Sequence, residues 1–205
     1  MELLFHDNDL AVCIKPVGLD SETQVPQMLK DTLGGEIFTV HRLDLNVGGV
    51  MVYARTKQTA AALSRSIQEG TMVKEYVAMV HGTPPEEGDW EDLLWKDASK
   101  NKVFVVKRMR GGVKKARLEF KRLTEGETSL VRIRLHTGRS HQIRVQFASR
   151  KMPLFGDGKY GSRKKGCRTA LFASALCGEG LSVSTLPPYE EYPWNLFAKE
   201  SYKND

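Results

Sequence analysis

Short apolar runs separated by turn residues follow one another along the first half of the chain. LLF and LAVCIK flank the turn Asp7-Asn8-Asp9, as the two strands of a β-hairpin do. IFTV and VMVYA are two further runs of strand length, and VKEYVAMVHG is a longer run that ends at the turn residues Gly-Thr-Pro-Pro. This pattern predicts a strand at each of these places.

The second half of the chain contains three more predicted strands. VFVV and KARLEF are joined by a turn at Gly111-Gly112, which predicts a second hairpin. In SLVRIRLH apolar and polar residues alternate, as in a strand with one buried face. The apolar face carries Val131, Ile133 and Leu135, and the polar face carries Arg132, Arg134 and His136.

Helical spacing first appears between Lys57 and Glu69. Leu63 and Ile67 are four residues apart there, which places them on one face of a helix. Gly70 follows directly and is suited to close the last turn. The sequence therefore predicts a helix over residues 57–69.

A second helix is predicted after Thr137-Gly138-Arg139. The run SHQIRVQFASR fits a helix with Ser140 as its N-cap and with Ile143 and Phe147 facing inward. Repeats and low-complexity linkers are absent. We therefore expect an α+β (mixed α/β) fold with a largely antiparallel central sheet and flanking helices, formed as one domain over residues 1–205.

Charge, cysteine content and hydropathy narrow the class of protein. The 205 residues carry a formal net charge of +6, which favours polyanionic partners. The three cysteines are scattered without a CxxC pair, so neither a disulfide framework nor a zinc site is indicated. The chain starts without a basic leader, and no run of about 18 uncharged apolar residues follows. We expect a cytoplasmic protein that does not bind a membrane.

The positive charge is concentrated in one stretch. From Ser99 to Lys115 the chain carries no acid, whereas the preceding TPPEEGDWED is acidic. The predicted hairpin in this stretch exposes a basic turn that can bind a phosphate backbone, although a merely solvated turn has the same composition. Its candidate contact residues are Lys107, Arg108, Arg110, Lys114 and Lys115.

Three motifs contain residue types suited to chemistry. HRLDLNVGGV places Asp44 at a junction between a strand and a loop, VKEYVAMVHG contains Tyr76, and HTGRSHQIR groups hydrogen-bond donors before a helix. With KPVGL and PLFGDGKYG, they occur in the order in which the RluA-type family of pseudouridine synthases has its motifs. The chain resembles this family over roughly residues 10 to 175, and the combination of HRLD, TGRSHQIR and GDxxYG is highly specific.

The resemblance implies an enzyme that isomerises uridine to pseudouridine in structured ribosomal or transfer RNA. The C–N glycosidic bond breaks, the base turns, and the ring rejoins the ribose through C5, so no cofactor or metal is expected. Asp44 matches the catalytic aspartate, and a carboxylate can act there as a nucleophile, a base or an electrostatic stabiliser. Tyr76 matches the tyrosine that stacks on the target base, and Arg144 matches the ion-pair partner of the aspartate.

Other donors in these motifs are expected to bind the RNA. Arg42 matches the position that fills the space left by the extruded nucleotide. We expect further contacts from His41, Arg139, His141 and Gln142, and we expect the protein to act as a monomer.

Each residue has a plainer interpretation when it is taken alone. Asp44 can be a turn residue, Tyr76 a core aromatic, Arg144 a solvated helix residue and Arg42 a simple phosphate contact. A catalytically idle RNA-binding module with the same fold is therefore an alternative, and a product assay distinguishes it from an enzyme. A hydrolase based on Ser140 and His141 is a further alternative that the sequence does not favour, since adjacent helix residues do not face each other and no GxSxG motif is present.

The chain also departs from the family pattern. Many members have Thr-Ser-Gly after the HRLDxx segment, where this chain has Val47-Gly48-Gly49 and therefore lacks two hydroxyls. Phe172 stands where a histidine is usual. We expect the backbone turn after Asp44 to be preserved, whereas any hydrogen bonds of those hydroxyls are lost.

Overall fold

The computed structural model describes residues 1–178 and 180–202. These residues divide into two compact units. The first consists of Met1–Lys74 and Phe172–Thr185, and the second of Glu75–Leu171 and the residues described from Leu186 onward. The fold is α+β, as the sequence predicts. Within the described residues, no helix combines the length and the hydropathy needed to cross a membrane.

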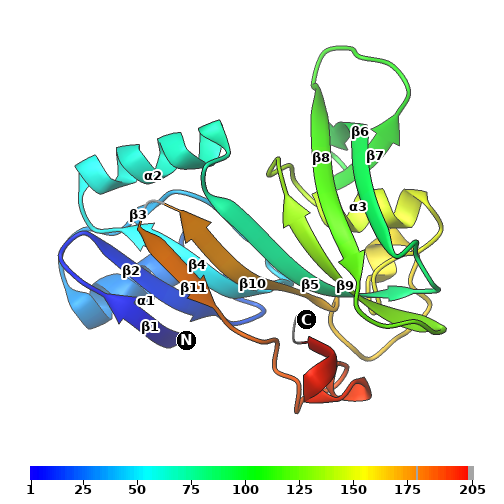
Figure 1. The fold of residues 1–205 in the computed structure, drawn as a ribbon. Helices are drawn as coiled ribbons and strands as arrows, with labels where there is room; N and C mark the ends of the chain where they lie inside the picture. Colours follow the sequence, from blue (N-terminus) through cyan, green and yellow to red (C-terminus); the bar gives the residue numbers. More distant parts are fainter. Residues whose placement is uncertain (179, 203–205) are drawn as a thin grey trace. The chain divides into compact units, whose positions relative to one another are not determined.

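The first unit is built on the strand order β1-β2-β4-β10 (Figure 1). β4 and β10 form a parallel pair, whereas β1 with β2 and β2 with β4 are antiparallel. β3 pairs with β4, and β11 pairs with β10. The elements of this unit are β1 (Glu2–His6), β2 (Leu10–Lys15), α1 (Gln24–Leu33), β3 (Phe38–Thr39), β4 (Gly48–Ala54), α2 (Lys57–Glu69), β10 (Leu171–Gly178) and β11 (Leu181–Ser184).

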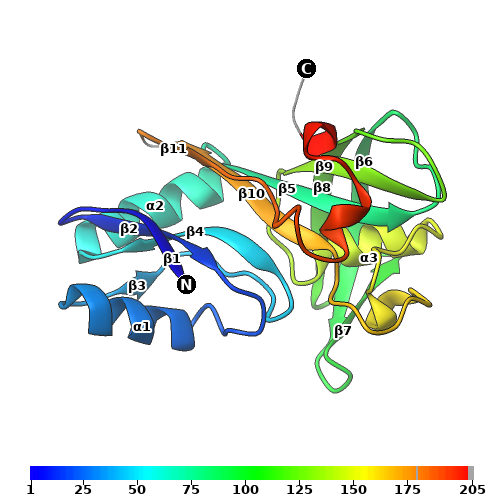
Figure 2. The ribbon, with the colours of Figure 1, turned by 90° about the horizontal axis from the view of Figure 1, so that it is seen from below.

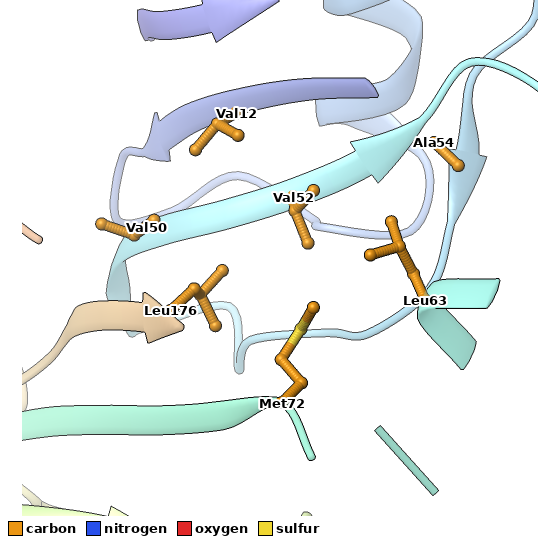
Figure 3. Packing of buried hydrophobic residues seen from close by; sticks show 7 residues of the cluster. All are labelled: Val12, Val50, Val52, Ala54, Leu63, Met72 and Leu176. Atoms are coloured by element: carbon orange, nitrogen blue, oxygen red, sulfur yellow. The ribbon is translucent and has the colours of Figure 1, made fainter. Parts of the chain in front are cut away.

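One core cluster of the first unit lies on one face of β4, whose residues are all buried. Figure 3 shows Val50 and Val52 of this strand packed with Leu63 of α2 and Leu176 of β10. Met72, which directly precedes β5, belongs to the same cluster. All five are at most 2% exposed. Because side chains alternate along a strand, the next residue, Tyr53, points to the other face. α1 and α2 lie on opposite sides of these strands (Figure 2).

Local sequence signals in this unit are confirmed. Asp7 closes the first hairpin by accepting hydrogen bonds from the backbone N–H groups of Asp9 and Leu10, at 2.7 and 2.8 Å. The predicted helix over 57–69 is α2, and Gly70 ends it in the left-handed conformation. The sequence pattern did not indicate α1, since Pro26 interrupts its first turn. Proline is tolerated there because first-turn N–H groups have no partner within the helix.

The second unit contains the strand order β9-β8-β6-β7, with all neighbours antiparallel. β5 begins at the end of the first unit and continues along the chain into the second. The elements are β5 (Val73–His81), β6 (Glu87–Asp97), β7 (Lys102–Val106), β8 (Val113–Arg122), β9 (Thr128–Leu135), α3 (Gln142–Ser149) and the 3-10 helices Gly158–Tyr160, Trp194–Leu196 and Lys199–Tyr202.

The prediction that VFVV and KARLEF form a hairpin is wrong. Both runs are strands, β7 and β8, but β6 lies between them. Leu94 of β6 has Val105 as its partner on one side and Lys114 on the other. β6 was not predicted, because the first half of this strand is rich in acids. In the structure the exposed acids Glu87, Asp89 and Glu91 alternate with less exposed residues. Residues 107–112 therefore form a connection between two strands that do not pair.

α3 confirms the predicted second helix and its inward residues. Ile143 is 3% exposed, and Phe147 is fully buried against Trp90 and Phe120, with ring centroids 4.7 and 5.3 Å apart. The predicted N-cap is wrong, because His141, in the left-handed conformation with φ 51°, occupies that position in place of Ser140. The alternation of β9 is confirmed.

Candidate active site

Asp44 lies on a half-buried loop whose backbone is held on both sides of the carboxylate. The buried Ser21 hydroxyl donates to the carbonyl of Leu43 at 3.0 Å and accepts from its N–H at 3.2 Å. The N–H of Gly18 donates to the carbonyl of Leu45 at 2.8 Å. The N–H of Val47 donates to the Asp44 carbonyl at 2.9 Å, so the chain turns directly after Asp44. All these bonds use main-chain atoms of the loop.

Lys15 places a buried cation near the same loop. Its Nζ donates to the carbonyls of Pro16 and Leu19 at 3.0 and 2.8 Å. Burial lowers the pKa of the Lys15 ammonium to about 8, and the charges of Asp20 and Asp44 act in the opposite direction by raising it. Lys15 therefore interacts electrostatically with Asp44 and holds the KPVGL turn beside the Asp44 loop.

The two residues before Leu43 differ in their surroundings. The Nε2 atom of His41 accepts a hydrogen bond from the N–H of Val52 at 3.2 Å. Burial, with a smaller effect of the Lys74 charge, lowers the pKa of His41 to about 3, so the ring is neutral and its proton lies on Nδ1. Arg42 is exposed and forms an ion pair with Glu22 at 3.4 Å.

Tyr76 lies on β5 in the second unit and is 7% exposed. The strand places it among apolar neighbours from Val77 to Val80, all of which are at most 2% exposed. A flat ring held in this way loses little conformational freedom when it stacks on another ring.

Arg144 is buried on α3 and has Asp157 as a partner. Its Nε and Nη2 atoms donate to the two carboxylate oxygens of Asp157 at 2.7 and 2.9 Å, which is a bidentate ion pair. The two side chains are 6% and 1% exposed. Asp44 and Arg144 belong to different units, and their pairing remains a prediction.

The remaining residues of HTGRSHQIR fall into two groups. Gln142 is 3% exposed, and its amide accepts from Thr137 and from the N–H of Arg139 and donates to the carbonyl of Arg117. It therefore stabilises the loop from inside, and its position does not favour the predicted RNA contact. Arg139 is exposed, and His141 shares a hydrogen bond of 2.8 Å with the hydroxyl of Tyr160.

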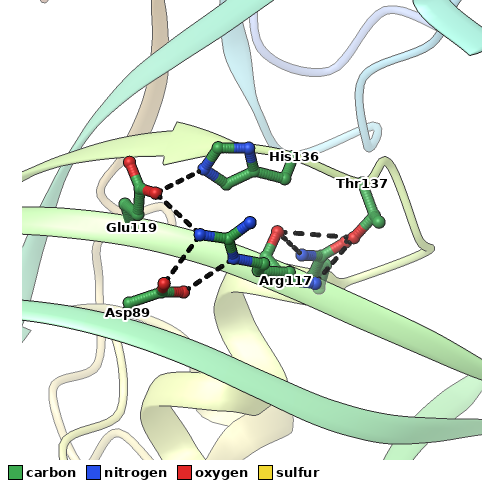
Figure 4. A network of polar contacts seen from close by, with 6 residues as sticks. Asp89, Arg117, Glu119, His136 and Thr137 are labelled. Carbon is green, nitrogen blue, oxygen red and sulfur yellow. Dashed lines mark hydrogen bonds and ion pairs between the residues drawn. The ribbon is translucent and has the colours of Figure 1, made fainter. Parts of the chain in front are cut away.

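A second bidentate arginine pair occurs on the charged face of the same unit. Arg117 donates to both carboxylate oxygens of Asp89 at 2.9 and 2.7 Å and to Glu119 at 3.1 Å, and His136 approaches Glu119 at 2.9 Å (Figure 4). Unlike Arg144, Arg117 is 43% exposed, so this network is worth little to stability.

The five basic residues that were predicted to bind a phosphate backbone are exposed. Lys107, Arg108 and Arg110 lie in the connection between β7 and β8, and the Arg110 guanidinium lies 5.2 Å from the ring of Trp95. Lys114 and Lys115 lie on β8, and Lys115 forms an ion pair with Glu91 at 3.6 Å. The connection between β7 and β8 therefore offers the densest exposed cluster of the predicted phosphate contacts.

Sequence reasoning left out residues that support the predicted site. Lys15 lies in KPVGL and Asp157 lies in GDGKYG, so both motifs were recognised without a role for these residues. Ser21 follows KPVGL closely, and a short polar side chain there carried no signal of its partner 22 positions later. The sequence signals that could have identified two of these residues are the proline after Lys15 and the glycines on both sides of Asp157.

The fold and the motifs together define a class. Residues 9–149 match the family model described as RNA pseudouridylate synthase, and the chain belongs to this family. Its relatives place it among the RluA-type members. A protein named dual-specificity RNA pseudouridine synthase RluA, from Yersinia pestis, is 31% identical over 193 residues, covering 86% of this chain and 91% of the relative.

A further relative and a solved structure are also similar to the chain. An uncharacterized RNA pseudouridine synthase from Aquifex aeolicus is 34% identical over 198 residues, which cover 87% of this chain and 61% of the relative. The chain thus spans less than two thirds of that protein. The solved structure of human RNA pseudouridylate synthase domain containing 1 has the same fold, with a TM-score of 0.80 at 20% identity over 92% of this chain and 84% of that one.

The two departures from the family pattern, at Val47-Gly48-Gly49 and at Phe172, lie on paired strands. Phe172 is the register partner of Gly48 in the parallel pair of β4 and β10, and Ala173 is the partner of Gly49. Phe172 is 6% exposed. The glycines therefore lie where two backbones approach closely, directly after the Asp44 loop.

Proposed function

We propose that the chain is an RNA pseudouridine synthase that isomerises uridine in structured RNA, ribosomal or transfer, without a cofactor. The observation that carries the proposal is family membership over residues 9–149. The motif HRLD adds to it, because Asp44 there resembles the family's catalytic aspartate. The braced backbone around Asp44 supports it, because a reacting group benefits from a fixed position. The name of the Yersinia relative supports an RNA substrate.

In this proposal the residues act in the following way. Asp44 reacts with the uridine so that the glycosidic bond breaks and reforms at C5. Tyr76 stacks on the base, and Arg144 pairs with Asp44 and keeps it ionised. Arg42 fills the space of the extruded nucleotide, which its exposure permits. We further propose that the protein acts as a monomer in the cytoplasm and that residues 1–205 work as one catalytic domain.

The test is to map pseudouridines in total RNA from cells with and without this protein. Carbodiimide modification followed by primer extension detects each pseudouridine. A site that is missing in the deletion and restored by the wild-type protein, but not by Asp44→Asn, identifies the substrate. An unchanged pseudouridine pattern, combined with binding of the purified protein to RNA, would favour the idle RNA-binding alternative.

The β7–β8 connection is expected to contribute to RNA affinity through phosphate contacts. Changing Lys107, Arg108 and Arg110 to Gln should weaken binding and flatten the slope of log affinity against log salt. Since each lost contact contributes about 0.7 on single strands and about 0.9 on duplexes, loss of three should flatten it by about two units or more. Binding of one RNA measured at several salt concentrations gives the slope.

The matched control removes the same charge elsewhere. Lys30, Lys57 and Arg65 are exposed residues of α1 and α2, and changing all three to Gln also lowers the net charge by three. This control should change the slope by less than about one unit, since no close contact is lost. Equal slopes for the two variants would show that the connection has no special role, and Arg132 and Arg134 would then be tested.

A further inference from the structure

The guanidinium of Arg144 needs a fixed partner because it is buried. A charge removed from water without a partner is strongly unfavourable, and Asp157 supplies the opposite charge and two acceptors. The bonds from Nε and Nη2, at 2.7 and 2.9 Å, fix the plane of the guanidinium as well as its position. The orientation of Arg144 is therefore determined largely by where Asp157 lies.

Asp157 in turn lies on a loop with little freedom to move. Its N–H donates to the carbonyl of Leu154 at 3.0 Å, and its carbonyl accepts from the N–H of Tyr160 at 3.1 Å. The preceding Gly156 has φ 76°, and a Cβ built there would lie 2.3 Å from the carbonyl oxygen of Arg168. A side chain at position 156 would meet this backbone atom, so the main chain of Asp157 is held in place.

Tyr160 of the same loop completes the surroundings of Arg144. Its ring centroid lies 5.1 Å from the guanidinium carbon, a favourable cation–π distance. Its hydroxyl accepts from the N–H of Val103 at 2.9 Å and bonds to Nδ1 of His141 at 2.8 Å. These two bonds hold the Tyr160 ring in place. The ring restricts the movement of the Arg144 guanidinium, in addition to the restriction by Asp157.

We propose that Asp157 is a positioning residue that acts through Arg144. It holds the Nε and Nη2 edge of the guanidinium, and this fixes the orientation that Arg144 needs in order to pair with Asp44 in the proposed function. The inference rests on the proposed function, and it assigns a role to the GDGKYG segment. Asp157 itself touches neither the substrate nor the reacting atoms in this scheme.

Asp157→Asn tests the inference with little change of shape. An amide offers one acceptor where the carboxylate offers two, so the guanidinium loses a bond and its orientation. We expect kcat to fall roughly 100-fold, the usual consequence of a small misplacement of a reacting group. KM should stay within about threefold, because the RNA contacts are untouched. Single-turnover assays on the mapped RNA separate the two quantities.

A double variant tests whether Asp157 acts through Arg144. Arg144→Lys keeps the charge but cannot donate two parallel bonds, so part of the positioning is already lost. Adding Asp157→Asn to Arg144→Lys should lower kcat far less than it does in the wild type. Equal factors in both backgrounds would overturn the inference, because Asp157 would then act independently of the guanidinium.

A matched control and a second variant keep the test decisive. Asp89→Asn breaks the equally bidentate but exposed pair with Arg117, and kcat should not change. If Asp157→Asn fails to fold, Asp157→Glu retains the charge while shifting the carboxylate, and it should lower kcat with KM unchanged. A folded Asp157 variant with wild-type kcat overturns the inference. A wild-type protein that makes no pseudouridine refutes the proposed function instead.

Discussion

Asp44→Asn is expected to lower the rate of pseudouridine formation by roughly four orders of magnitude, as is typical when an essential carboxylate becomes an amide. The amide is neutral, so it is a poor nucleophile or base and cannot stabilise an electron-poor sugar. The fold should be unaffected, because Ser21 and Gly18 hold the main chain of the loop and not the Asp44 side chain. RNA affinity should therefore remain within a few-fold.

The measurement combines a product assay on the mapped RNA with binding of the same RNA. Asp31→Asn is a suitable control, since Asp31 is an exposed carboxylate on α1 whose hydrogen bond from Gln27 an amide oxygen can also accept. Substantial turnover by a folded Asp44→Asn protein would refute the catalytic assignment. A large loss of RNA affinity would instead assign the carboxylate to substrate binding.

The same variant has a consequence that does not depend on activity. The Asp44 charge raises the pKa of Lys15 against the larger effect of burial, which brings that pKa to about 8. Removing the charge should lower the pKa of Lys15 below its wild-type value. Nuclear magnetic resonance titration of the lysine side chain measures this change. An unchanged pKa would show that the two groups do not interact in solution.

Gly49→Ala is expected to lower the free energy of unfolding by about 3 kcal/mol or more. Gly49 has φ 128°, and a Cβ built there would lie 2.3 Å from the carbonyl oxygen and 2.5 Å from the nitrogen of Ala173. Both atoms are backbone, so relief requires that β4 and β10 separate at their parallel pairing. Equilibrium unfolding in urea, followed by circular dichroism, measures the difference.

Gly70→Ala is the control that measures the cost of backbone strain without a steric clash. Gly70 also has a positive φ, 76°, but no atom lies within 4 Å of the position of its Cβ. This variant should cost only about 1 kcal/mol, which is the penalty of a side chain in the left-handed conformation. A Gly49→Ala protein no less stable than Gly70→Ala would show that β4 and β10 are not tightly paired at this point.

The sequence predicted elements well where neighbouring residues determine them. The turn at Asp7 depends on bonds to residues two and three positions away, and α2 depends on its apolar spacing and on Gly70. The sequence missed β6 because its acids conceal the alternation. Ser140 was predicted as the N-cap of α3 because serine is a good cap, whereas in the structure His141 occupies that position in the left-handed conformation.

For the candidate site too, some residues were identified from the sequence and others only from the structure. The motifs alone were enough to select Asp44, Tyr76 and Arg144, because the order and spacing of chemically suited residues are properties of the sequence. Only the tertiary structure revealed that Ser21 and Lys15 hold the Asp44 loop and that Asp157 holds Arg144.

The sequence by itself determined the family and most of the local elements of this protein, and it supplied the prediction of which residues react. The tertiary structure decided that β6 separates β7 from β8, that Gly49 lies against Ala173, and which buried acid pairs with Arg144. The physical reason is the range of the interactions. A turn or a helix is decided by hydrogen bonds and packing within a few residues. A strand neighbour or a buried ion pair is chosen from the whole chain by burial, and its energy depends on contacts that no local pattern contains.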